Sequence, residues 1–160
     1  MSVALFGCSF DILEDEETHS DQSIDELEDI ENFRPHALEH ILEGELNKQG
    51  QAVGFHYEGL ASSKGEIVKG TATPPDENGV YEAEVMVEEV EKQSNHGTST
   101  FYPKEWHAQD VVDAINEAYD SKEYIQGNTY AGMTEEGIVI QMYLDDENKI
   151  ISAFPVYEGA

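Results

Sequence analysis

The chain lacks the features that mark several large protein classes. It has 160 residues and one cysteine, Cys8, so no internal disulfide can form and a disulfide-stapled secreted scaffold is excluded. No apolar run approaches the roughly 20 residues that a membrane-spanning helix needs. The short apolar segment 3–8 has no basic start, so we expect no signal peptide and no membrane association.

Positive charge is also scarce. Lysine and arginine together number 8, against 35 aspartates and glutamates, which gives a formal net charge of −27. Such a field repels other polyanions at low salt, and it argues against unaided binding to nucleic acid or to anionic membranes. A saline working environment, which would screen this charge, is one interpretation of the composition.

The first part of the chain predicts helices. The acidic residues gather in an N-terminal arm, 1–32, in which apolar residues at helical spacing predict a helix from Ser20 onward. A second helical stretch is predicted over 37–43, and Gly44 ends it.

The remainder predicts mainly antiparallel strands. Alternating apolar residues and turn signals predict one helix over 110–122 and strands over 51–58, 81–91, 98–102, 137–144 and 149–157. We therefore expect the α+β class, with N-terminal helices followed by two antiparallel β-sheets, and a single domain over 33–160.

Two histidines are the best candidates for chemistry. The chain has no HExxH pattern, no serine or cysteine nucleophile elbow and no glycine-rich phosphate loop. Histidine titrates near neutral pH, so His40 and His56 could act as base and acid on one substrate. Taken singly, each has a plainer interpretation: His40 as a packed helix residue and His56 as a half-exposed strand residue.

Four short motifs occur together in the chain. They are His40–Glu45 (HILEGE), Gly54–His56 (GFH), Ser99–Trp106 (STFYPKEW) and Ile151–Pro155 (ISAFP). In this order they resemble the EndoU endoribonuclease family, in particular its bacterial branch, which occurs in polymorphic toxins. The resemblance covers about 33–158. It implies a two-lobed fold, with lobes of about 33–97 and 98–160 and a central cleft.

The resemblance also implies a chemistry. The 2′-hydroxyl of RNA would attack the adjacent phosphate and leave a 2′,3′-cyclic phosphate, with no metal or other cofactor. The family pattern makes His40 and His56 the acid–base pair, and we expect His40 as base and His56 as acid. A lysine would stabilise the charge on the pentacoordinate phosphorus.

The position of that lysine departs from the family pattern. Thr98 stands near the place where the family has its lysine, so we favour Lys92, which can reach across the hairpin. Lys104 in the third motif is an expected substrate contact, although a surface role for either lysine is equally acceptable. Ser152 matches a hydroxyl that reads the base, and Phe154 stands where many members carry a tyrosine and could stack on a base.

The resemblance suggests a bacterial toxin domain that cleaves RNA, with tRNA as one candidate. An immunity protein would neutralise it, and its place of action would be the cytoplasm of the producing cell or of a target cell. The alternative is a catalytically weak or inactive EndoU-like acidic module that binds a protein partner. A third and weaker hypothesis is a nucleic-acid mimic.

Overall fold

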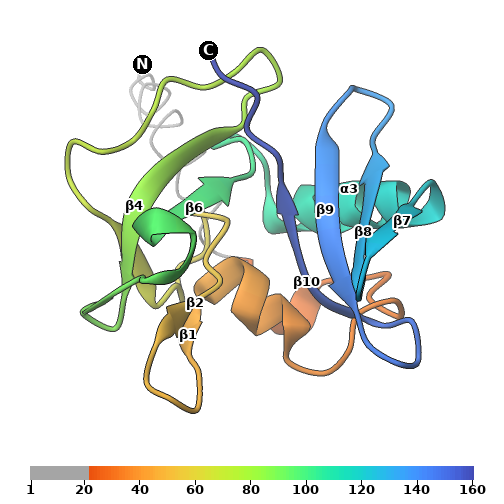
Figure 1. Cartoon of the computed structure of the whole chain (residues 1–160), viewed down its shortest axis with the longest axis horizontal. Helices are drawn as coiled ribbons and strands as arrows, with labels where there is room; N and C mark the ends of the chain where they lie inside the picture. The colour runs from red at the N-terminus through yellow and green to blue at the C-terminus, as the bar shows by residue number, and fades with distance from the viewer. Residues whose placement is uncertain (1–21) are drawn as a thin grey trace, which may run out of the picture.

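The structure, a computed structural model, describes residues 22–160, and Figure 1 shows the arrangement of its elements. Most of the predicted acidic arm lies outside these residues. The helical elements are η1 (Ile24–Glu26), η2 (Glu39–Glu43), η3 (Ser94–Gly97) and α3 (Ala108–Asp120). The strands are β1 (Glu45–Leu46), β2 (Ala52–Val53), β3 (Gly65–Ile67), β4 (Tyr81–Val87), β5 (Val90–Glu91), β6 (Thr98–Phe101), β7 (Glu123–Gln126), β8 (Thr129–Met133), β9 (Val139–Leu144) and β10 (Ile150–Pro155).

Antiparallel pairing organises residues 22–160 into three sheets. One is the short pair β1–β2, one has the order β10-β9-β8-β7, and one has the order β3-β4-β5 with β6 also paired to β4. The two larger sheets lie on either side of the molecule, and β10 is the edge strand of its sheet that lies nearer the other one (Figure 1). The division into an arm and two lobes stays a prediction.

The predicted α+β class, with N-terminal helices before two sheets, is wrong. The described part of the chain is mostly β, and α3 is its only helix longer than a turn or two. The predicted helix from Ser20 is reduced, within these residues, to the single 3₁₀ turn η1. Its acidic residues repel one another at helical spacing, and Asp29 adopts a positive φ of 63°, which a helix does not allow. None of the helices in 22–160 is long and apolar enough to cross a membrane.

The long helix was predicted correctly and covers one face of the β10-β9-β8-β7 sheet. Its buried residues include Val111, Val112 and Ile115, which join Ile140 and Met142 of β9 in the main core. Helix and sheet approach so closely that a Cβ added at Gly132 would lie 1.9 Å from the carbonyl oxygen of Ala118. Figure 1 shows α3 lying behind this sheet.

A second, smaller core holds the other large sheet together. Phe101 of β6 stacks on Tyr81 of β4 with centroids 5.2 Å apart, and Phe55 meets Phe101 edge-on at 5.1 Å. The strand predicted over 51–58 ends early, because Gly54 and Phe55 both have positive φ and turn the chain after β2. This turn carries His56 out of the sheet and toward η2.

Candidate active site

His40 and His56 are brought together where η2 crosses the chain leaving β2. The amide of Phe55 donates to the carbonyl of His40 at 3.0 Å, and the amide of His56 donates to the carbonyl of Ile41 at 2.7 Å. Gly54, with φ of 80°, permits the crossing because an added Cβ would lie 2.1 Å from the His40 carbonyl oxygen. The backbone therefore fixes the separation of the two histidines. The crossing also uses a π-helical turn, a rare geometry that often marks functional sites.

Both rings line one open cleft of about 720 Å³. One wall comes from η2 and from the segments around β2, β5 and β6, and the opposite wall comes from β9 and β10. The residues with polar side chains along it include His40, His56, Glu82, Lys92, Ser94, Asn95, Thr100, Gln141, Tyr143, Ser152 and Tyr157. The structure therefore places both histidines in one cleft.

The His56 ring is buried and rigidly held. It is 5% exposed, and its Nδ1 lies 2.7 Å from the carbonyl oxygen of Thr100. Because a carbonyl only accepts, Nδ1 carries the proton and Nε2 keeps a lone pair. The ring also stacks on Phe154, with centroids 5.4 Å apart. Burial, followed by the charge of Lys92, holds the pKa of His56 well below 6.5, so this ring is neutral at pH 7.

The His40 ring has a carboxylate partner. Its Nδ1 lies 3.1 Å from Oε2 of Glu45, and its side chain is 20% exposed. Burial lowers the pKa of His40 below 6.5, while the hydrogen bond and charge of Glu45 act in the opposite direction. Sequence reasoning quoted Glu45 in the first motif but gave it no role. Its position just beyond the turn that carries His40 was the available signal.

Lys92 lines the cleft and belongs to a buried chain of hydrogen bonds. Its side chain is 9% exposed, and Nζ donates to Oγ of Ser99 at 2.8 Å. Ser99 in turn donates to the carbonyl of Gly54 at 3.0 Å, so the lysine is tied to the crossing that carries the histidines. Burial lowers the pKa of Lys92 to about 8. Ser99 was not predicted, because nothing in the sequence pairs it with a residue seven positions earlier.

Two predicted residues lie outside the cleft lining. The Oγ1 of Thr98 donates to the carbonyl of Asn95 at 2.9 Å, which helps to close the turn η3. Lys104 lies over the ring of Tyr81, with Nζ 5.6 Å from the centroid. The structure thus brings Lys92 to the two histidines and leaves Thr98 and Lys104 aside, although Ser94 and Asn95 of the same turn do line the cleft.

Comparison with known proteins gives the family. The model of the bacterial EndoU nuclease domain matches residues 35–157. The chain belongs to the bacterial EndoU nuclease family. It is also 50% identical, over 132 residues, to a curated Bacillus cereus protein named Toxin. That match covers 82% of this chain and 24% of the relative, so the EndoU chain spans about a quarter of the relative's length. No solved structure matches the chain.

Ser152 and Phe154 of the EndoU fold stand on the wall opposite Lys92. Both belong to β10, and both line the cleft, as the resemblance implied. Phe154 has the His56 ring against it and meets Tyr143 edge-on, with centroids 5.8 Å apart. The predicted stacking of this ring on a base stays a prediction.

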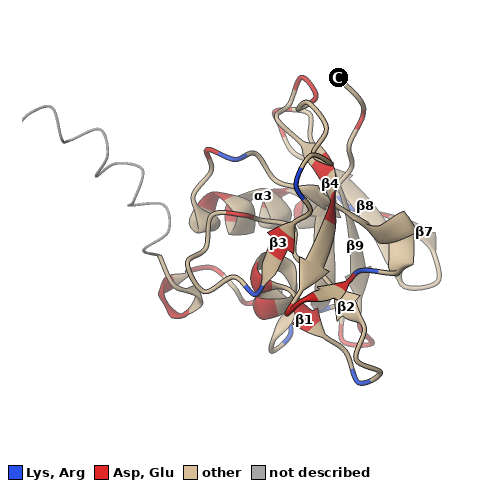
Figure 2. Ribbon diagram, turned by 90° about the vertical axis from the view of Figure 1, so that its left-hand side faces the viewer, with Lys and Arg blue, Asp and Glu red and all other residues tan. Residues whose placement is uncertain are grey.

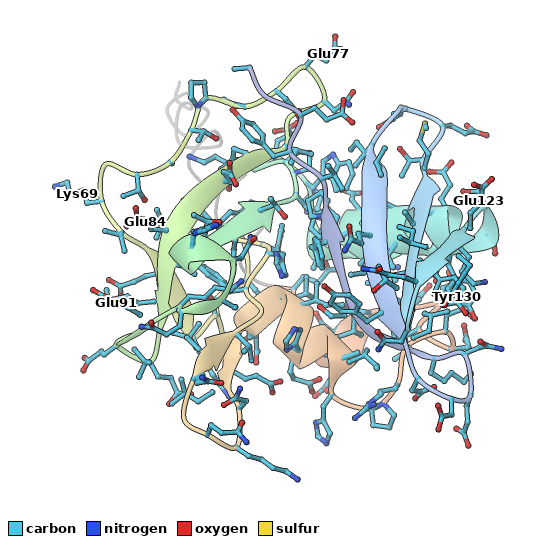
Figure 3. The ribbon with its side chains drawn as sticks, in the orientation of Figure 1. Lys69, Glu77, Glu84, Glu91, Glu123 and Tyr130 are labelled. Carbon is cyan, nitrogen blue, oxygen red and sulfur yellow. The ribbon has the colours of Figure 1, made fainter. Side chains whose placement is uncertain are left out.

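The acidic charge of the EndoU domain is distributed unevenly. Red segments recur along most of the ribbon in Figure 2, and blue ones are few. Within residues 22–160, Glu82 is the only acidic residue that lines the cleft. A second hollow of about 660 Å³, next to α3, is lined by six acidic residues: Asp110, Asp113, Glu117, Asp120, Glu135 and Glu136. Glu84, labelled in Figure 3, follows Glu82 by two positions on β4, shares its face of the sheet and is exposed.

Proposed function

We propose that this EndoU domain cleaves RNA by transesterification. The observation that carries the proposal is the convergence of two imidazoles and one buried ammonium group on a single cleft with little acidic lining. RNA brings its own nucleophile, the 2′-hydroxyl, so the protein has to supply a base, an acid and a positive charge. His40, His56 and Lys92 provide those three groups.

The electrostatics favour His56 as the base and His40 as the acid, the reverse of the assignment expected from the sequence. His56 is neutral and presents a free Nε2, which is the state of a general base. His40 has the carboxylate of Glu45 at its Nδ1, which stabilises the imidazolium. A phosphate entering the cleft would add a second negative charge beside His40 and favour its protonated form further.

The bond changes then balance without another reactant. Nε2 of His56 takes the proton of the 2′-hydroxyl while O2′ bonds to phosphorus. The bond between phosphorus and O5′ breaks, and the His40 imidazolium donates its proton to O5′. The products are a 2′,3′-cyclic phosphate and a free 5′-hydroxyl. Lys92 stabilises the charge that builds on the non-bridging oxygens between these steps.

The biological setting that we propose is that of a nuclease toxin. The family and the relative named Toxin support this role. The substrate would be RNA in the cytoplasm of a target cell, with tRNA as a candidate, and an immunity protein would protect the producing cell.

Replacement of each histidine tests the proposal. Purified protein is incubated with total RNA and with a fluorescent oligoribonucleotide, and product ends are identified by mass spectrometry. We expect His40→Gln and His56→Gln each to lower the cleavage rate by about 100-fold or more. The control is His36→Asn at an exposed histidine with positive φ, which should cleave normally.

Several results would contradict the proposal. Cleavage by His40→Gln or His56→Gln at the normal rate, with circular dichroism showing a native fold, would refute the acid–base pair. Products with 3′-hydroxyl ends would refute the transesterification. A pure wild-type protein that never cuts RNA would favour the acidic binding module instead.

A further inference from the structure

The wall opposite the catalytic groups is built by two neighbouring strands in register. Gln141 of β9 pairs with Phe154 of β10, and Tyr143 of β9 pairs with Ser152 of β10. Paired residues of antiparallel strands project from the same face, and alternate residues along a strand share that face. All four side chains therefore belong to the open face of the sheet, opposite the face that α3 covers, and all four line the cleft.

Three polar groups on this wall have no protein partner. The amide of Gln141, the hydroxyl of Tyr143 and the hydroxyl of Ser152 make no side-chain hydrogen bond to another residue of 22–160. The opposite wall differs: His40, His56 and Lys92 are each bound to a neighbouring group. Thr100 Oγ1 on that wall is buried without a hydrogen-bond partner among residues 22–160. The wall of β9 and β10 presents three side chains with unpaired donors and acceptors to whatever enters the cleft. Convergent polar groups that are free to bond a ligand are typical of groups that set ligand specificity.

Ring contacts connect this wall to the acid–base pair. Phe154 packs against His56 on one side and against the edge of Tyr143 on another. A ribose whose 2′-hydroxyl reaches Nε2 of His56 would therefore hold its base next to β9 and β10. Gln141 is paired with Phe154 across the two strands, and both residues line the same cleft.

We propose that Gln141 reads the base 5′ to the cleaved bond through hydrogen bonds to its Watson–Crick edge, with the Tyr143 hydroxyl beside it. A primary amide offers one acceptor and two donors, so it can pair with an adjacent donor and acceptor on a base edge. This proposal rests on the proposed ribonuclease function. It adds a residue of β9 to the base-binding residues Ser152 and Phe154 that the resemblance implies.

The test fixes the cleavage site and varies only the base. Four short DNA oligonucleotides each carry a single ribonucleotide, with uracil, cytosine, adenine or guanine, so that only that nucleotide has a 2′-hydroxyl. We expect wild-type protein to prefer one base by about tenfold or more in kcat/KM. Gln141→Leu should cut that preference to about threefold or less, mainly by slowing the best substrate. Gln141→Glu, which keeps the acceptor and loses the donors, should change the rank order.

A matched control and the contrary outcomes complete the test. Gln126→Leu makes the same substitution on an exposed residue of β7 in the same sheet, and it should keep the wild-type preference. An unchanged preference in both Gln141 variants, or equal cleavage of all four bases by wild-type protein, would overturn the reading role while the ribonuclease function stands. If total RNA is cut but none of the four oligonucleotides is, the reading role alone is overturned; if neither is cut, both proposals are overturned.

Discussion

Lys92 is a buried lysine in a chain that has few cations, and its burial fits the proposed role of binding a phosphate. Lys92 is 9% exposed, has the Oγ of Ser99 as its hydrogen-bond acceptor, and has no carboxylate partner within residues 22–160. Holding an ammonium group away from water without a counter-ion destabilises the fold. The same desolvation strengthens its attraction for a phosphate, since Coulomb energies rise as the local dielectric falls. The buried charge of Lys92 therefore lowers the stability of the fold and strengthens the attraction of the site for a phosphate.

Lys92→Met should stabilise the protein and inactivate it. At pH 7 we expect the melting temperature to rise by roughly 5 °C, because a side chain of similar length replaces the desolvated charge. The folded pKa of about 8 lies below the usual 10.5, so the unfolded chain binds more protons between these values. Wild-type stability therefore rises from pH 8 to 10.5, and the advantage of the variant should shrink across that window.

Thermal melts at pH 7 and pH 10, with cleavage assays at pH 7, check this prediction. The control is Lys69→Met at an exposed lysine, which should change neither the melting temperature nor the activity. A lower melting temperature of Lys92→Met at pH 7 would show that the ammonium group stabilises the fold instead.

At the scale of the elements, the backbone is tightly constrained where η2 crosses the segment from β2 to His56. Gly54 has both a positive φ and a carbonyl oxygen where its Cβ would be, so two separate requirements select glycine there. The same segment receives the hydrogen bond from Ser99 that positions Lys92. A displacement at Gly54 would therefore move all three proposed catalytic groups relative to one another.

Gly54→Ala should abolish activity through this geometry. Gly50→Ala is the matched control, because Gly50 has nearly the same φ, 79° against 80°, with nothing within 4 Å of an added Cβ. Each alanine costs about 1–2 kcal/mol for the left-handed backbone. Only Gly54→Ala also pushes against the His40 carbonyl, so we expect its cleavage rate to fall by about 100-fold and its stability to fall further. Chemical unfolding and cleavage assays compare the two variants; equal losses in both would refute the role of the crossing.

The sequence predicted correctly those elements whose apolar residues recur at the spacing of a helix or of a strand. Helix α3 and the strand β9 each bury one face, so their patterns follow the helix or strand repeat. The hairpin β7–β8 was missed because all four β7 residues are exposed and show no alternation. The helix predicted from Ser20 was wrong because apolar spacing alone does not compensate for acidic repulsion and the turn at Asp29.

Most candidate site residues were expected from contiguous motifs, whereas Lys92 was expected from its position across a predicted hairpin. His40, His56 and Ser152 lie in short peptides that a family pattern can match. The contact of Ser99 with Lys92 and the pairing of Gln141 with Phe154 depend on strand register, which is a property of the folded sheet. The relative proton affinities of the two histidines depend on burial and on Glu45, and burial is likewise a property of the fold.

At the scale of the whole molecule, the chain carries a net charge of −27, and the proposed substrate is also an anion. The acidic residues beside α3 and along the outer faces repel RNA at long range, whereas the cleft itself contains Lys92 and a single lining carboxylate. Long-range repulsion is screened by salt, with a Debye length of about 30 Å at 0.01 M and about 8 Å at 0.15 M. Contacts inside the cleft are much shorter than either length, so salt should weaken them less.

The association of RNA with this protein should therefore improve with salt, opposite to the usual behaviour of nucleic-acid-binding proteins. We expect kcat/KM to rise about threefold or more between about 10 and 150 mM NaCl, with kcat nearly constant. The rise should be larger for a 20-nucleotide RNA than for a dinucleotide, because each added phosphate adds to the repulsion. Comparing both substrates at each salt concentration separates repulsion from any general effect of salt on the enzyme. A steady fall of kcat/KM with salt for the longer RNA would instead mean that the local cations of the cleft govern the encounter, and that the acidic surface does not face the approaching substrate.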